Sequence, residues 1–196
     1  MKKLIMLVVV FGLIFSLCNV ASATIITDVE RRPPMVRIAG PLVEDSLSYT
    51  DRTHQYNEIP DFLLGADYVM VRNDDRTVAN YELDVTTNAD GWMYLFIDNR
   101  VGDNNASNPP DLTLKMLWVL PMGFVDTGKD IGIDESGDGS VNNRNSVYKL
   151  WVPAGTITLK EQNSGSLNMY GVGIPEPATI ALLGFGGLAL LRRKRS

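Results

Sequence analysis

The central part of this 196-residue chain is predicted to be all-β, as an antiparallel β-sandwich or jelly roll. Short runs of alternating or continuously apolar residues recur along it, and turns rich in Gly, Pro, Asn and Asp separate them. No stretch of the middle shows a long helical period or an internal repeat. About 150 residues remain once the two ends are set aside, which is the size of one domain.

Segment 24–45, at the start of this region, is expected to be an extended lead-in. It contains Arg31-Arg32-Pro33-Pro34, and each proline fixes φ and removes a backbone donor. The sandwich domain itself is placed at 46–174.

The strands of the domain are predicted from their periodicity. Residues 80–86 alternate between apolar and acidic side chains, which indicates a half-buried strand. Residues 91–97 are apolar on both faces and are expected in the middle of the sandwich. Further strands are expected at 112–120 (carrying Trp118), 147–152, 156–160 and 167–174. Loops are expected at 73–76, 88–90, 99–110 and 126–145.

Four stretches of this region together resemble a small β-sandwich module of bacterial extracellular proteins, some of which contain polysaccharide-active domains. They are GADYVMVRNDD (65–75), MYLFIDNR (93–100), GFVDTGKDIGID (123–134), and YKLWVPAGTITL with MYGVGI near its end. The resemblance implies a galactose-binding-like jelly roll in a protein that is associated with carbohydrate. It assigns no functional residues.

The N-terminus, 1–23, has the pattern of a secretory signal peptide. Two lysines precede an apolar stretch, and Ala21-Ser22-Ala23 supplies the small residues that signal peptidase accepts at Ala21 and Ala23. Cys18 follows Leu17 rather than a small residue, so a lipoprotein is the lesser alternative. The mature chain would then contain no cysteine, and a core, with or without a metal, must stabilise it.

The C-terminus, 175–196, has three parts. Pro175-Glu176-Pro177 interrupts regular structure, and the uncharged run 178–191 follows it. Arg192, Arg193, Lys194 and Arg195 then favour a cytoplasmic position for the end of the chain. As a helix, the run would span roughly 21 Å, short of a hydrocarbon core of about 30 Å. This predicts a marginal anchor suited to enzymatic handling, or alternatively a permanent single span in a thinned bilayer.

Together, IPEPATIALLGFGGLALLRRKRS closely resembles the PEP-CTERM sorting signal of bacterial exosortase systems. The resemblance implies export across the inner membrane and transient anchoring there by the hydrophobic helix. A membrane-embedded exosortase would then recognise Pro175, Glu176 and Pro177 and remove the tail. Proteins with this signal are associated with extracellular polysaccharide and biofilm matrix, so an outer-surface or matrix location is expected.

The net charge of the central region limits the classes of molecule that it is expected to bind. The chain has 18 Lys+Arg and 23 Asp+Glu; without the six basic residues and one acidic residue of the two ends, 12 and 22 remain, a net charge near −10. This acidity disfavours nucleic acid and anionic lipid surfaces. It is typical of a soluble extracellular protein or of one that recruits divalent cations.

Catalytic signatures are weak in this sequence. The mature chain has one histidine, His54, and no cysteine, which excludes His-based metal sites and a cysteine nucleophile. Asp74-Asp75 and Asp98 are the carboxylates considered for glycoside hydrolysis, although Asp74-Asp75 equally fits a charged turn. A non-enzymatic protein is therefore predicted.

Calcium is the one metal that the sequence suggests. Asp134, Ser136 and Asp138 place oxygens at alternate positions before Gly139, as at the start of a calcium loop. The twelfth position is Asn145 rather than glutamate, and flanking helices are not expected. A solvated Gly/Asp loop between two strands is the alternative.

Carbohydrate would be recognised through aromatic rings or polar loop residues. Trp92, Trp118, Trp151, Tyr94 and Tyr148 could stack on sugar rings, but their apolar surroundings favour core packing for each. Exposed polar contacts are expected instead from residues such as Tyr49, Tyr56, Asp74, Arg76 and Arg100. The predicted function is a surface or matrix protein that binds extracellular polysaccharide; a calcium-stabilised structural protein and a polysaccharide-active enzyme are the alternatives.

Overall fold

A computed structural model describes residues 24–31, 36–165 and 167–176 of the chain. The predicted signal peptide with Ala21 and Ala23, Pro177, the hydrophobic run and the basic end lie outside these residues. Within the described ranges no helix is long and apolar enough to cross a membrane.

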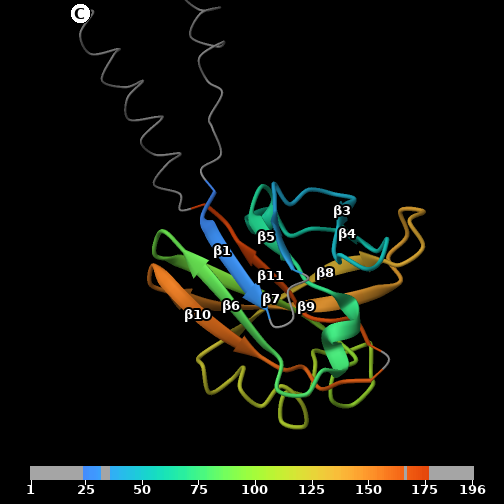
Figure 1. The fold of residues 1–196 in the computed structure, drawn as a ribbon. Helices are drawn as coiled ribbons and strands as arrows, with labels where there is room; N and C mark the ends of the chain where they lie inside the picture. The colour runs from blue at the N-terminus through green and yellow to red at the C-terminus, as the bar shows by residue number, and fades with distance from the viewer. Residues whose placement is uncertain (1–23, 32–35, 166, 177–196) are drawn as a thin grey trace, which may run out of the picture.

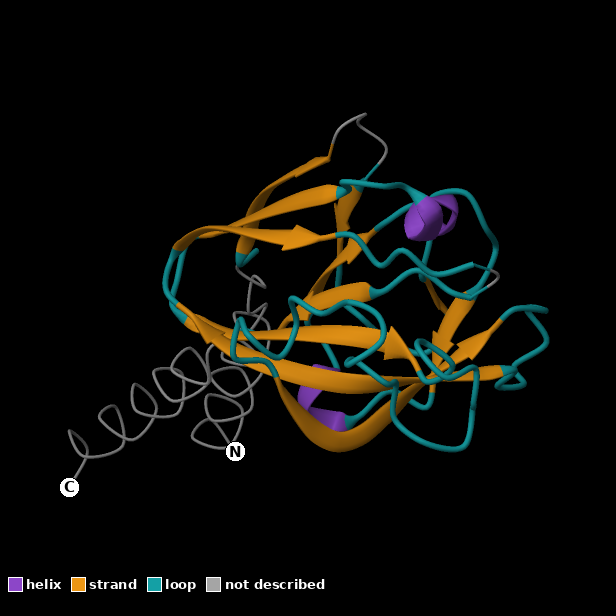
Figure 2. Ribbon diagram, turned by 90° about the horizontal axis from the view of Figure 1, so that it is seen from below, coloured by secondary structure: helices purple, strands orange, loops and turns teal. Residues whose placement is uncertain are grey.

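The described chain is an antiparallel β-sandwich, which confirms the predicted fold class (Figure 1). The smaller sheet has the order β1 (Ile26–Arg31), β6 (Glu82–Thr87), β10 (Gly155–Lys160). The larger sheet has the order β2 (Arg37–Ala39), β5 (Asp67–Met70), β11 (Gly171–Ile174), β7 (Gly91–Asp98), β9 (Asn143–Val152), β8 (Val125–Asp134), β4 (Gln55–Asn57), β3 (Ser46–Leu47). Two short 3-10 helices, η1 (Asp61–Leu63) and η2 (Asn73–Thr77), lie outside the two layers (Figure 2).

The main core fills the space between the two sheets. In β6, Leu83 and Val85 are fully buried while Glu82 is exposed, as the alternation predicts. Facing them from β7 are Met93, Leu95 and Ile97, each with no exposed surface.

A second core covers the opposite face of the larger sheet. It packs residues of the 42–66 segment, among them Leu42, Tyr56 and Leu63, against Phe96 of β7. Apart from Trp92, strand β7 is therefore buried on both faces, which explains its continuous apolar sequence. The neighbouring strand β11 leaves space for these rings, since a Cβ added at Gly173 would lie 2.7 Å from Phe96 Cζ.

The predicted lead-in is part of the sandwich, because β1 and β2 both lie within 24–45. Strand β1 pairs with β6 along the edge of the smaller sheet, and Ile26 is fully buried. The basic Arg31 is also buried, at 3 % exposure, because it forms an ion pair with Asp75. A buried arginine beside Arg32-Pro33-Pro34 has no periodic signature, so the strand could not be recognised from the sequence.

The predicted strand at 112–120 is absent, and consecutive turns replace it. Its buried residues are Leu112, Met116 and Val119, whereas Leu114 and Leu117 are 58 % and 61 % exposed. Buried positions thus recur every three or four residues, which is the spacing of turns and not of a strand. Hydrogen bonds such as Val119 N–H to the Met116 carbonyl (2.9 Å) close these turns.

The loop predicted at 126–145 is also wrong over most of its length. Strand β8 continues to Asp134 and β9 begins at Asn143, so the loop contains only 135–142. The first half of β8 is mostly exposed, and its polar residues gave no sign of a strand.

Both ends of the described chain meet at one end of the sandwich, which we call the exit end. The Ile25 amide donates to the Asp67 carboxylate at 2.5 Å, and Asp67 is paired with Ile174 at the end of β11. Gly91 and Val152, which pair where β7 begins and β9 ends, lie at the same end. The opposite end, where β6 begins at Glu82 and β10 ends at Lys160, is called the far end.

Candidate functional site

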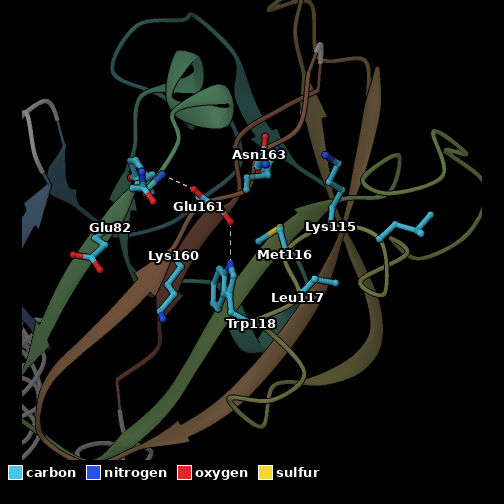
Figure 3. A pocket seen from close by; sticks show the side chains of 12 residues that line it. Glu82, Lys115, Met116, Leu117, Trp118, Lys160, Glu161 and Asn163 are labelled. Atoms are coloured by element: carbon cyan, nitrogen blue, oxygen red, sulfur yellow. Dashed lines mark hydrogen bonds between the residues drawn. The ribbon is translucent and has the colours of Figure 1, made fainter.

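A groove of about 410 Å³ opens at the far end of the sandwich. It is formed by three segments distant in the sequence, namely 80–82 at the start of β6, the 114–118 turns and 160–163 at the end of β10 (Figure 3). The three segments bring apolar, acidic, basic and amide side chains to one concave surface.

The indole of Trp118 is held in a fixed orientation in the wall of the groove. Its Nε1–H donates to the Glu161 carbonyl at 2.9 Å, as Figure 3 shows. The ring also makes edge-on contacts with Tyr170 and Phe124, at centroid distances of 5.9 and 6.4 Å. A half-buried indole fixed on these sides offers a pre-oriented surface to a ligand.

The rim of the groove is polar and carries both charges. Glu82 and Lys160 are exposed and lie opposite each other across β6 and β10. Asn163 is exposed in a left-handed backbone conformation with φ 51°. The Glu161 carboxylate instead accepts the backbone N–H of Asn80, which fastens two of the three walls together. Groups of this kind bind hydroxyl-rich ligands through directional hydrogen bonds.

The expectation of core packing is wrong for two of the aromatic residues considered. Trp92 is 41 % and Trp151 is 54 % exposed, and they form a cross-strand pair at 5.3 Å on the outer face of the larger sheet. Tyr94 and Tyr148 are buried, and burial raises the pKa of the Tyr148 hydroxyl to about 12. The exposure of Trp92 could not be predicted from the apolar sequence of β7, because periodicity does not show how far the 42–66 segment extends over the outer face of the sheet.

The polar loop residues expected to contact sugars do not form a site. Tyr49 and Tyr56 are buried at 1 % and 0 % exposure, so their predicted exposure is wrong. Asp74 is surrounded by the arginines Arg52, Arg72 and Arg76, and the Arg76 and Arg52 side chains hold the pKa of its carboxyl below the usual value despite partial desolvation.

The residues considered for catalysis are likewise dispersed. The half-buried His54 ring packs edge-on against Tyr49 at 5.8 Å, and desolvation lowers its pKa. Asp75 lies in η2 and pairs with Arg31, whereas Asp98 is fully buried at the end of β7 and pairs with Arg100. None of these three lines the groove.

The predicted calcium residues do come together in the β8–β9 loop. The hydroxyl of Ser136 lies 3.0 Å from Asp134 Oδ1 and 2.9 Å from Asp138 Oδ1. The Asp134 carboxylate also accepts the backbone N–H groups of Gly137 and Gly139, both at 2.7 Å. Among the described residues no group of three or more His, Cys, Asp or Glu side chains is arranged to hold a metal. Calcium binding therefore stays a prediction.

The hydrogen bonds around Asp134 predict a pH dependence. Burial alone would raise the pKa of this carboxyl, but the Gly139, Gly137 and Ser136 donors outweigh it and lower the pKa below 3.8. The stabilisation is complete above pH about 4 and is lost as the pH falls through the lowered pKa of the folded state. Asp134→Asn should therefore show a shallower loss of Tm below pH 4 than wild type, measured by circular dichroism. Parallel curves would contradict this role, and adding calcium or a chelator at pH 7 tests the metal separately.

The sequence does not predict the groove. Trp118 is a candidate for sugar stacking, but Lys160, Glu82 and Asn163 carry no motif and are separated by up to 81 residues in the chain. Their proximity depends on the pairing of β6 with β10, which periodicity does not specify.

The chain is similar to a known protein family in its tail and to a solved structure in its fold. Residues 173–195 match the PEP-CTERM protein-sorting motif. A β-glucuronidase of glycoside hydrolase family 2 shares the fold, with a TM-score of 0.60 and 17 % identity, over 79 % of this chain and 15 % of that chain. No curated protein sequence matches. The chain thus spans a small part of the glucuronidase, and the likeness supports the β-sandwich alone.

Proposed function

We propose that the chain acts as an exported protein that is processed by an exosortase, because it carries a PEP-CTERM sorting motif that begins within β11 and continues into the C-terminal tail. The same motif implies anchoring in the membrane before processing. The described residues Pro175 and Glu176 follow directly on the last strand.

We propose that the β-sandwich binds extracellular polysaccharide in the far-end groove after sorting to the cell surface or matrix. The single observation that carries the proposal is the combination of a fixed indole with a rim of Glu82, Lys160 and Asn163 in one concave site. Sugar rings present C–H faces that stack on indole and hydroxyl groups that bond to charged and amide side chains. The mixed charge of the rim favours a neutral or weakly acidic glycan over a densely charged one.

We propose binding without catalysis. Hydrolysis of a glycoside by the usual route needs two available carboxyl groups flanking the bond. The Glu161 carboxylate is already engaged by the Asn80 amide, which supports a structural role for it. The glucuronidase activity belongs to a chain of which the likeness covers 15 %, so it supplies no argument for activity here.

Replacing Lys160 by alanine should weaken glycan binding about tenfold, which corresponds to about 1.4 kcal/mol. Lys160 is exposed on the rim, so its loss removes hydrogen bonds to the ligand without opening the core. We would measure retardation of the mature domain in gels containing a neutral galactomannan or the acidic polysaccharide alginate, and test for released reducing sugar in parallel.

Lys129→Ala is the matched control, because Lys129 is also exposed on a strand but lies outside the groove. Equal retardation of the two variants would contradict the proposed site. Absence of retardation by either polysaccharide would contradict binding of these glycans, and release of reducing sugar would favour the enzymatic alternative.

A further inference from the structure

An exposed aromatic patch lies on the outer face of the larger sheet, towards the exit end. It consists of Trp92, Trp151 and Phe62, which are 41 %, 54 % and 39 % exposed. Phe62 stacks on Tyr94 at 5.2 Å, and Trp92 contacts Trp151 edge-on at 5.3 Å. The patch is therefore made of rings held by their neighbours, not of isolated surface residues.

The strand register places this patch beside the point where the chain leaves the domain. Gly173 of β11 is paired with Tyr94 of β7 in an antiparallel ladder. Continuing the same register sets Pro175 opposite Trp92, whose other neighbour is Trp151. The two indoles thus lie next to the start of the Pro-Glu-Pro sequence (Figure 1 shows β7 and β11 side by side).

The connection to the apolar run is short. Three residues separate Ile174, which is paired in the sheet, from Ala178, where the run begins. Four residue steps extend at most about 14 Å. The headgroup layer on each side of a bilayer is roughly 5–8 Å thick. While the run is in the membrane, the exit end therefore lies within the headgroup layer or no more than about 9 Å beyond it.

The chemistry of the patch matches that layer. Indole rings prefer the membrane–water interface, where an apolar ring and a polar N–H are both accommodated. Lys149 lies over the Trp92 ring at 4.8 Å and adds a cation that can reach lipid phosphate. Aromatic side chains can bind the headgroup layer without a positive net charge on the protein. Such binding is therefore compatible with the acidic character of the domain.

We propose that the Trp92–Trp151–Phe62 patch rests on the phospholipid interface while the C-terminal segment is anchored, and so orients the domain before the tail is removed. The far-end groove, with Trp118, then points away from the membrane. The three tryptophans of the chain thereby fall into two groups, two at the lipid surface and one remote from it.

The test uses this division. The chain without its signal peptide, residues 24–196, would be reconstituted through its tail in nanodiscs of phosphatidylcholine, with or without bromine on the acyl chains near the headgroup. Brominated lipid should reduce the tryptophan emission of the wild-type chain by about half or more, because short-range quenching reaches Trp92 and Trp151 in the interface. The variant with both Trp92→Phe and Trp151→Phe should retain its Trp118 emission unchanged.

Trp118→Phe is the reciprocal variant and should remain quenched. Unquenched wild-type emission would overturn the proposal and leave the patch to a protein partner. Equal fractional quenching of wild type and the double variant would also overturn it, because the domain would then have no preferred orientation. Circular dichroism of each reconstituted variant confirms that the domain is folded.

Discussion

Asp98→Ala is expected to lower the free energy of unfolding by about 3 kcal/mol, because it leaves the partly buried Arg100 without its counter-ion and leaves buried amide donors unsatisfied. The Asp98 side chain is fully buried and accepts Arg100 Nε at 2.9 Å and Nη2 at 2.5 Å. It also accepts the backbone N–H of Asn168 at 3.0 Å.

Urea denaturation followed by tryptophan fluorescence would measure this loss. Asp103→Ala is the matched control, because Asp103 also accepts hydrogen bonds from its own loop but is exposed, and its effect should be clearly smaller. Asp98→Asn keeps the shape and should fall between wild type and Asp98→Ala. A loss below about 1 kcal/mol in Asp98→Ala would place the pair among ordinary surface ion pairs.

The same carboxylate links the core to the groove. Asn168 is followed in the chain by β11, and its carbonyl accepts the Gln162 amide at 2.8 Å. Gln162 in turn accepts the Tyr170 N–H at 2.7 Å and lines the groove. Asp98 thus fixes, through Asn168, the segment that forms one wall of the binding site, so its loss should weaken glycan binding as well as stability.

Strands were predictable where burial imposes a period. Leu83 and Val85 alternate with acidic residues in β6 because one face meets the core, and β7 is continuously apolar because both faces are covered. The strand predicted at 112–120 does not form, and Leu114 and Leu117 of this segment are exposed at the groove. Composition there indicated a strand, whereas the positions of the buried residues indicated turns.

The candidate site was less predictable, because its residues have no mutual spacing in the sequence. Lys160 faces Glu82 only after β10 has paired with β6. The exposure of Trp92 and Trp151 depends on how far the 42–66 segment extends over the larger sheet. Both features depend on the tertiary structure. The C-terminal sorting signal, in contrast, is a continuous sequence motif and could be recognised directly.

The arrangement gives the two ends of the sandwich different surroundings. The exit end carries the chain toward the sorting motif and bears two exposed indoles. The far end carries the groove, separated from the membrane by the length of β6 and β10. A groove at this end would remain accessible to an extended polysaccharide both before and after the tail is removed.

Arg31→Leu should cost about 3–5 kcal/mol, because it leaves the Asp75 carboxylate buried without its cation. The two side chains are 2 % and 1 % exposed, and the guanidinium also lies 5.5 Å from the centre of the Tyr81 ring. Burial outweighs the attraction of Arg31 even in the wild type, and so raises the pKa of Asp75. Without Arg31 that pKa should rise further.

The raised pKa makes the defect of Arg31→Leu dependent on pH. A carboxyl whose pKa is higher in the folded state binds more protons there, so stability falls as the pH rises from about 4 to the folded pKa. Acidification from pH 7 to pH 5 should therefore recover part of the lost stability of Arg31→Leu. Adding Asp75→Leu should recover more of it at pH 7, since no charge is then buried and apolar side chains occupy the space.

Arg144→Leu provides the comparison, because Arg144 forms an ion pair with Glu58 in which both side chains are about half exposed. Such pairs contribute about 0–1 kcal/mol. Urea denaturation of the single and double variants at pH 7 and pH 5 would measure all of these differences. If Arg31→Leu lost no more than Arg144→Leu, the ion pair would contribute little to holding β1 in the sandwich. If the loss is large and Asp75→Leu relieves it, the segment that resembled a lead-in is held in the sandwich by a paired charge.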